Sequence, residues 1–505
     1  MDSLLGAVRM SWLDWLVLAA YGCLMLGVGL YYARQNKSAD DYLLGGRRMS
    51  PIALGLSLFA TLVSTLSYLA TPGEMVANGP MMITQVAAHP LIFVIVGYGL
   101  IPLLMRQPVT SAYELLETRL GTSIRMAGAG VFLLLRFGWM ATILFATSKV
   151  VLVPLLGLED WWTPWLCVAL GVVTAMYSSS GGVKAVVTTD AIQAITMLVG
   201  AVVTVAVITH RMGGVAEWWP QDWPSHWQTP SWGFDPNVRV SFGILVLSTT
   251  LWYVCTNGSD QMSIQRFLST RDAAAARRTL AVAQITDATV AILLAITGVA
   301  VLGFYRAHPP ELTDGATLSS AGDRLFPRFI MTQMPMGLSG LVLAAILSAG
   351  LSSLSSGVNS ACAVLDRDFL SRRSGHLSSG TATVVRLKRL TWVVAWVAIA
   401  LSLLNATIEG NLVERCFKLV NLLTAPLFVL FFLALLVPWA NAAGAWLGLV
   451  GSILTAVMIA YSRDLGLNLR INFVWMMPCS LLVGVTLGTV ASALARPWRT
   501  ATPTE

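Results

Sequence analysis

Three serines at helical spacing stand inside a long apolar stretch of this chain. Ser352, Ser355 and Ser356 lie three and four residues apart, so in a helix they share one face. Ala349 and Ser353 flank that face. Polar groups are costly in hydrocarbon unless they find partners, and they therefore often mark a functional site. Hydroxyl and carbonyl oxygens are hard ligands that suit a small hard cation such as Na⁺.

The same serines are also typical of close helix packing. Small residues let membrane helices approach one another, and serine hydroxyls can bond back to their own backbone. The cluster by itself leaves packing and an ion site both open.

A second polar interruption lies in the apolar segment 51–74, where Thr61, Ser64, Thr65 and Ser67 break the hydrophobic run. A helix that unwinds inside a membrane exposes carbonyl groups, which is tolerated where they line a cavity. In many transporters such carbonyls coordinate Na⁺. A continuous helix with back-bonded hydroxyls is also consistent with this segment.

Two ionisable residues lie in or beside apolar runs. Asp190 falls where an apolar segment is expected to begin, so it is either a helix cap or an ion ligand. Arg136 lies within an apolar run, where a charge needs a partner or water. It either pairs with a buried carboxylate or contacts a solute, and the scarcity of carboxylates at its depth favours the solute.

Composition identifies the class of protein. Of 505 residues, 56% are hydrophobic and only 11% are charged, against about 25% charged in a typical soluble protein. We expect an all-α polytopic membrane protein with one transmembrane domain over residues 1–505. The net charge of the chain is +7. Because the Lys and Arg residues that cause it lie in particular loops, this charge does not indicate a nucleic-acid partner. No triad or metal motif accompanies His89, which argues against an intramembrane enzyme.

Apolar runs of membrane-spanning length predict thirteen helices. Their ranges are 11–33, 51–77, 82–105, 126–155, 162–179, 187–209, 238–258, 279–305, 336–365, 389–406, 413–438, 440–461 and 471–495. Lys and Arg gather in alternate loops, among them one that contains Arg266. Such loops are usually cytoplasmic, which places the N-terminus outside and the C-terminus in the cytoplasm.

Six motifs in order resemble the sodium:solute symporter family, which includes sodium–glucose, sodium–proline, sodium–sialic acid, sodium–iodide, and sodium–monocarboxylate or multivitamin cotransporters. Each motif is weak alone, but their order is specific. They are Asp-Asp-Tyr-Leu-Leu-Gly-Gly-Arg at 40–47, Ser-Leu-Phe-Ala-Thr at 57–61, segments within 108–121, Tyr177 to Gln193, Asp260-Gln261 with Gln265-Arg266, and the serine segment closing on Asn359, Ser360 and Asp366.

The resemblance implies a leucine-transporter-like fold with an inverted repeat of five helices. The repeats would cover 51–209 and 238–438, and peripheral helices would cover 11–33 and 440–495. The repeat itself is not visible in the sequence.

The resemblance also implies site residues. A first sodium site would use the carbonyls of Ala60, Val63 and Ala349 with the hydroxyls of Ser352 and Ser353. A second sodium, as in sialic acid transporters, would use Asp190, Ser352, Ser355 and Ser356. The family's solute site points to Ser64, Ser67, Gln85, Arg136, Trp252 and Asn421.

From these residues we expect a sodium-coupled symporter in the cell membrane, not an enzyme, with Na⁺ as its cofactor. Arg136 favours an organic anion, such as a monocarboxylate or sialic acid, as the solute. A neutral sugar, amino acid or vitamin is the alternative, and an ion channel or a membrane sensor is the competing class. We expect a functional monomer whose partners are the solute, Na⁺ and the lipid bilayer, with no nucleic acid.

Overall fold

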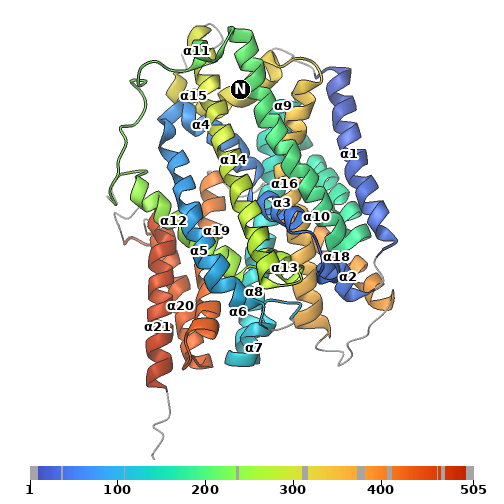
Figure 1. Cartoon of the computed structure of the whole chain (residues 1–505), viewed down its shortest axis with the longest axis vertical. Coiled ribbons are helices and arrows are strands. Elements are labelled where there is room, and N and C mark those ends of the chain that lie inside the picture. The colour runs from blue at the N-terminus through green and yellow to red at the C-terminus, as the bar shows by residue number, and fades with distance from the viewer. Residues whose placement is uncertain are drawn as a thin grey trace, which may run out of the picture.

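In a computed structural model, the protein is a bundle of long helices that run roughly along one axis (Figure 1). The structure describes residues 10–35, 38–106, 109–234, 238–309, 317–371, 381–405, 412–462, 464–467 and 473–495. Every regular element within these ranges is helical. The predicted all-α class is therefore confirmed.

The helical elements follow one another along the chain, and η marks those that are 3₁₀ or π turns. They are α1 (Trp12–Ala33), α2 (Ala39–Leu44), η1 (Gly45–Arg47), α3 (Pro51–Leu62), α4 (Thr65–Asn78), η2 (Pro80–Ala88), α5 (His89–Val94), η3 (Ile95–Leu100), α6 (Ile101–Leu104), α7 (Glu114–Leu120), α8 (Thr122–Ala146), η4 (Thr147–Leu152), α9 (Val153–Leu155), η5 (Asp160–Trp162), α10 (Thr163–Met212), α11 (Val215–Trp218), α12 (Phe242–Ser259), α13 (Gln261–Leu268), α14 (Ala273–Ala307), α15 (Leu318–Gln333), α16 (Leu338–Val364), η7 (Leu365–Leu370), α18 (Thr381–Asn405), α19 (Leu412–Leu436), α20 (Ala442–Ala460), η8 (Phe473–Trp475) and α21 (Met476–Leu494).

Among the described residues, ten helices are long and apolar enough to cross a membrane, and the bent pair α3–α4 would make eleven. Helix α10 contains 50 residues, and a straight helix of that length would span about 75 Å against a hydrocarbon core of about 30 Å. A break at Gly182 divides it. Counting the two halves of α10 separately moves the total toward thirteen, a number that stays a prediction.

The break in α10 requires glycine. Gly182 has φ 58° and ψ −154°, and a Cβ there would lie 2.6 Å from the carbonyl oxygen of Tyr42 in α2. Only a residue without a side chain fits both the backbone angle and the close approach. The second half of α10 carries Asp190, which is fully buried.

The loops predicted to face the cytoplasm gather at one end of the bundle. Figure 1 shows α2 and α7 toward that end, and α11 and α15 at the opposite end. This separation agrees with the alternation of loops inferred from charge. The predicted orientation concerns termini (1–9 and 496–505) that lie outside the described residues.

Helix α16, which carries the serine cluster, lies in the centre of the bundle. Its side chains are almost all buried, and it packs against α1, α3, α8, α10 and α18. The carboxylate of Asp14 in α1 accepts hydrogen bonds from the backbone N–H groups of Gly337 and Gly340, both at 2.8 Å, at the start of α16. This contact satisfies donors that a helix start leaves unpaired. Helices α20 and α21 lie at the edge opposite α1 (Figure 1).

Besides α10, two helical segments are interrupted inside the bundle, and each of these interruptions ends at a capping residue. Val63 separates α3 from α4 with φ −83° and ψ 138°, and the two halves are bent by 70°. Asp260 separates α12 from α13 with φ −82° and ψ 126°. Ser64 caps α4, and Asp260 caps α13, by accepting backbone N–H bonds. The sequence indicated the first break but not the second.

Candidate ion and solute site

The break after α3 places free carbonyl groups directly against the serines of α16. The hydroxyl of Ser352 donates to the carbonyl oxygen of Ala60 at 2.7 Å. The hydroxyl oxygen of Ser353 lies 2.8 Å from the carbonyl oxygen of Thr61 and 2.9 Å from that of Val63. These carbonyls are available because the extended backbone at Val63 ends the helical hydrogen-bond pattern.

This cluster contains more oxygen acceptors than hydroxyl protons. Ser353 has one proton but faces two carbonyls, and the oxygen of Ser352 also lies 3.3 Å from the carbonyl of Ala349. Both serines are fully buried, so neither hydroxyl is open to bulk water. A small cation is the group that satisfies buried, uncharged oxygens in excess. The structure therefore brings together all five residues predicted for the first sodium site and adds the carbonyl of Thr61.

The close approach of α16 to the start of α4 depends on Gly350. A Cβ at this position would lie 2.4 Å from the Oγ1 atom of Thr65 and 2.8 Å from the Oγ1 atom of Thr147. Those two threonines share a hydrogen bond of 3.0 Å. A glycine one turn before the serines thus lets the two polar segments meet.

A second, charged cluster surrounds Asp190 on the same side of α16. Its carboxylate accepts hydrogen bonds from the hydroxyls of Ser57 at 2.6 Å and Ser356 at 2.9 Å, and from Ser355 at 3.3 Å. Asp190 is fully buried and lies eight residues beyond the break at Gly182. The alternative of a helix cap at the interface is therefore wrong, because this carboxylate is inside α10 and faces α3 and α16.

The positive charge beside Asp190 is Arg266. A guanidinium nitrogen of Arg266 lies 3.2 Å from the carboxylate of Asp190, and both side chains have no exposure to solvent. The same group donates to the hydroxyl of Thr61 at 3.1 Å and to that of Ser356. Placing Arg266 in a cytoplasmic loop was wrong, because it belongs to α13, whose eight residues are all buried.

Three of the four residues predicted for a second sodium therefore do meet. Ser355 and Ser356 contact Asp190, whereas the hydroxyl of Ser352 points to the first cluster. A second Na⁺ would share this carboxylate with the guanidinium of Arg266. The second site stays a prediction.

Arg136 forms a buried ion pair with Asp260, the residue that caps α13. The other carboxylate oxygen of Asp260 accepts from the backbone N–H of Met262 at 2.8 Å. This pairing is one of the two alternatives that the sequence left open. The Nε of Arg136 has no hydrogen-bond partner within the described part of the chain, so the ion pair leaves this donor of the guanidinium unused.

The residues predicted to bind solute are only partly gathered. The hydroxyl oxygens of Ser64 and Ser67 lie 2.9 Å apart. Gln85, Trp252 and Asn421 are partly exposed, on η2, α12 and α19. Helix α12 packs against both η2 and α19, but no hydrogen bond of the described residues joins these three side chains to the two serines. Their grouping as a solute site stays a prediction.

Sequence reasoning missed the roles of Ser57, Asp260 and Arg266. The motif at Asp260-Gln261 and Gln265-Arg266 is visible in the sequence, but its polar residues resemble those of a loop. These partners could have been sought from the rule that each charge inside the membrane needs a buried counter-charge. Asp190 requires a cation, and Arg136 requires an anion.

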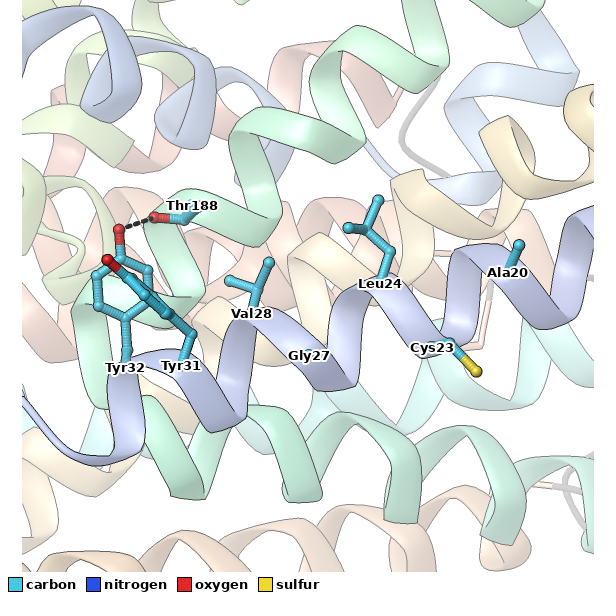
Figure 2. Close-up of a pocket in the computed structure, with 8 residues that line it drawn as sticks. All are labelled: Ala20, Cys23, Leu24, Gly27, Val28, Tyr31, Tyr32 and Thr188. Carbon is cyan, nitrogen blue, oxygen red and sulfur yellow. Dashed lines mark hydrogen bonds between the residues drawn. The ribbon is translucent and has the colours of Figure 1, made fainter.

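A depression of about 680 Å³ along α1 is separate from these clusters. It is lined by Ala20, Cys23, Leu24, Gly27, Val28, Tyr31, Tyr32 and Thr188, and Figure 2 shows Thr188 bonded to the hydroxyl of Tyr32. None of the predicted site residues lines it. Its lining is mostly apolar, as expected for a helix surface that faces lipid.

Comparison with known proteins adds a family and several relatives. The model of the sodium:solute symporter family matches residues 42–452. The sodium/sialic acid symporter SiaT of Proteus mirabilis is 28% identical over 496 residues, which cover 96% of each chain. Sodium-coupled monocarboxylate transporter 1 of Mus musculus is 28% identical over 473 residues, which cover 90% of this chain and 74% of that one.

A solved structure has a similar fold along nearly its whole length. It is the substrate-bound, outward-open state of a Na⁺-coupled sialic acid symporter, with a TM-score of 0.81 and 26% identity. The match covers 96% of this chain and 99% of that one.

Proposed function

The chain belongs to the sodium:solute symporter family, and from that premise we propose that it imports a small organic anion together with Na⁺ by alternating access. Sialic acid and a short monocarboxylate are the solute classes of choice. A relative of each specificity aligns over most of the chain.

Family membership confirms several expectations from the sequence. The chain is a sodium-coupled transporter and not an enzyme, it is a multi-pass protein of the plasma membrane, and its fold is leucine-transporter-like. Sodium is the coupling ion of its relatives.

The observation that carries the proposal is the excess of buried oxygen acceptors between the α3–α4 break and α16. We assign the first Na⁺ to Ala60, Val63, Ala349, Ser352 and Ser353, and we add the carbonyl of Thr61. One charge that moves down a membrane potential releases about 2.3 kcal/mol per 100 mV. A second Na⁺ beside Asp190, Ser355 and Ser356 would double that electrical contribution.

The remaining parts of the proposal concern architecture. The repeats would cover 51–209 and 238–438, and the breaks at Val63 and Asp260 support them because each lies in the first helix of its repeat. The N-terminus would lie outside, the C-terminus would lie in the cytoplasm, and one chain would suffice for transport.

The first experiment tests sodium coupling. Purified protein in liposomes should take up labelled sialic acid or pyruvate under an inward Na⁺ gradient, and replacing Na⁺ by choline should abolish uptake. Ser353→Ala should raise the sodium concentration for half-maximal uptake on the order of tenfold, as expected for about 1.4 kcal/mol of lost binding. Ser360→Ala is the matched control, because this buried hydroxyl of α16 bonds back to the carbonyls of Ser356 and Gly357. An unchanged sodium response in Ser353→Ala would contradict the site.

The second experiment tests whether Arg136 meets the solute. Because Arg136 is paired with Asp260, a solute carboxylate would have to compete with this residue. Asp260→Asn should therefore lower the KM for carboxylates, and the double variant Arg136→Ala/Asp260→Asn should raise it while leaving neutral hexoses unaffected. If both variants had the same KM for carboxylates as the wild type, Arg136 would be only a structural partner of Asp260, and a neutral solute would be favoured.

A further inference from the structure

A third polar cluster lies within the membrane-spanning segments, apart from the two sodium assignments. The Nε2 atom of His89, on α5, lies 2.7 Å from the Oδ2 atom of Asp287 on α14. The hydroxyl of Tyr253, on α12, donates to the same oxygen at 2.9 Å. We propose that His89, Asp287 and Tyr253 form a proton-binding site inside the membrane.

The hydrogen bonds of the imidazole ring carry the argument. Besides Asp287, the ring contacts the carbonyl oxygen of Val86 through Nδ1 at 2.9 Å. A neutral imidazole has one N–H and one lone pair. With an ionised Asp287, either tautomer would therefore point a lone pair at an acceptor oxygen less than 3 Å away. Both contacts are satisfied only when the His–Asp pair holds one additional proton, on the ring or on the carboxyl group.

Burial adds a reason for this proton to stay bound. The side chains of His89 and Asp287 are 9% and 18% exposed. With the proton, the pair is neutral as a whole; without it, one uncompensated negative charge remains among apolar helices, which is costly. Loss of the proton also places two acceptors in contact, so the side chains must rearrange.

No other charged group among the described residues contacts this pair. On α14, the next charged residues toward the start of the helix are Arg278 and Arg277, nine and ten residues from Asp287, and the guanidinium of Arg277 lies over the ring of Tyr98, 5.1 Å from its centre. On α4, Glu74 pairs with Arg239. Helix α12 carries no charged residue between Phe242 and Ser259.

The proton site adjoins two residues of the proposed solute site. Gln85 precedes His89 by four residues, in the η2 segment that leads directly into α5. The ring of Trp252 packs edge-on against that of Tyr253, with centres 4.8 Å apart. A rearrangement of the pair would therefore be transmitted to these two side chains. This consequence rests on the proposed function, whereas the presence of the proton does not.

The proton is tested directly on the purified full-length protein. Labelling the histidine rings with ¹⁵N reports an imidazolium, and infrared spectroscopy reports a protonated carboxyl group. At about pH 8, where an ordinary histidine is neutral, we expect one of these two signals, and we expect both His89→Gln and Asp287→Asn to remove it. If neither signal is present in the wild-type protein at that pH, the proposal is overturned whatever the chain transports.

Transport provides the second measurement. Sodium-driven uptake of sialic acid or pyruvate should change steeply with pH in the wild type, and His89→Gln and Asp287→Asn should remove that dependence. His210→Gln is the control, because His210 is exposed at the end of α10. Tyr253→Phe should shift the profile without abolishing it, since the titrating pair remains. Profiles of His89→Gln and Asp287→Asn that match the wild type would overturn the link to transport.

Discussion

The serines of α16 belong to two neighbouring clusters, in which buried polar groups find their partners differently. Around Ser352 and Ser353, every ligand is an uncharged oxygen, and acceptors outnumber protons. One turn further along the helix, Ser355 and Ser356 face Asp190, where a carboxylate is already matched by a guanidinium.

This difference favours ion binding at the first cluster and a structural role for the second. The named residues of the first cluster carry no charged side chain, and in the proposed function Na⁺ supplies the positive charge. The second contains its own cation in Arg266, which also donates to the hydroxyls of Ser57 and Thr61. A sequence motif rich in hydroxyls therefore does not by itself say how many ions bind. The count depends on which charges the fold supplies.

The largest expected effect comes from removing the cation of the second cluster. Arg266→Leu leaves Asp190 buried and unpaired, and we expect a loss of roughly 3–5 kcal/mol in the free energy of unfolding. The measurement is thermal unfolding of the purified protein with and without Na⁺.

The double variant Asp190→Asn/Arg266→Gln is the control for this prediction. It removes both charges, so it should recover most of the stability that the single variant loses. If Arg266→Leu were as stable as the wild type, the view that Arg266 is the structural counter-charge would be wrong.

Gly350→Ala should disturb the first cluster next most strongly. The added Cβ would overlap Thr65 and Thr147, which forces α4 away from α16 at a cost of about 1–3 kcal/mol. Sodium affinity should fall with it, as seen in the half-saturation of uptake. Gly22→Ala is the control: a Cβ there meets nothing within 4 Å, and neither property should change.

The substitution Thr61→Val tests the two clusters separately, because Thr61 contributes a different group to each. The hydroxyl of Thr61 donates to Ser356 at 2.8 Å, whereas its carbonyl faces Ser353. Valine removes the hydroxyl and keeps the carbonyl, so we expect a stability loss of about 1–3 kcal/mol with a smaller change in sodium half-saturation than Ser353→Ala. A larger change in sodium response than in Ser353→Ala would contradict the division between the clusters.

The smallest effect is expected at Asp272, which belongs to neither cluster. The backbone N–H of Ala275 donates to its carboxylate at 2.7 Å, which holds the pKa of Asp272 below its ordinary value. A carboxyl group with a lowered folded-state pKa stabilises the fold above its unfolded pKa of about 4, and loses this contribution as pH falls through the folded value. Asp272→Ala should therefore be slightly less stable at neutral pH, and the difference should vanish in acid. A difference that persisted in acid would contradict this assignment.

Much of the fold was predictable because membrane segments follow simple rules. Apolar length indicated the helices, and Thr61 and Ser64 indicated the break between α3 and α4. The contact of Ser352 and Ser353 with the break was predictable because the resemblance to a family supplied their partners near Ala60.

The counter-charges were harder to predict, because a sequence shows charges but not their partners. In the sequence, Arg266 resembled a loop residue because α13 is short, polar and flanked by turn residues. In the structure, all eight residues of α13 are buried. Asp260 lies 124 positions from Arg136, and nothing local connects them. The division of α10 near Gly182 was predicted, because 162–179 and 187–209 were expected to be separate spans. The contact of Gly182 with Tyr42 was not predicted.

The extended backbone at Val63 has a mechanical consequence. Thr61 belongs to the end of α3, Val63 joins the two halves, and both carbonyls meet the same hydroxyl of α16. Tilting α3 against α4 would therefore move both carbonyls away from this hydroxyl at the same time. If Na⁺ binds there as proposed, its binding depends on the angle between the two half-helices, and a bound ion would in turn hold that angle.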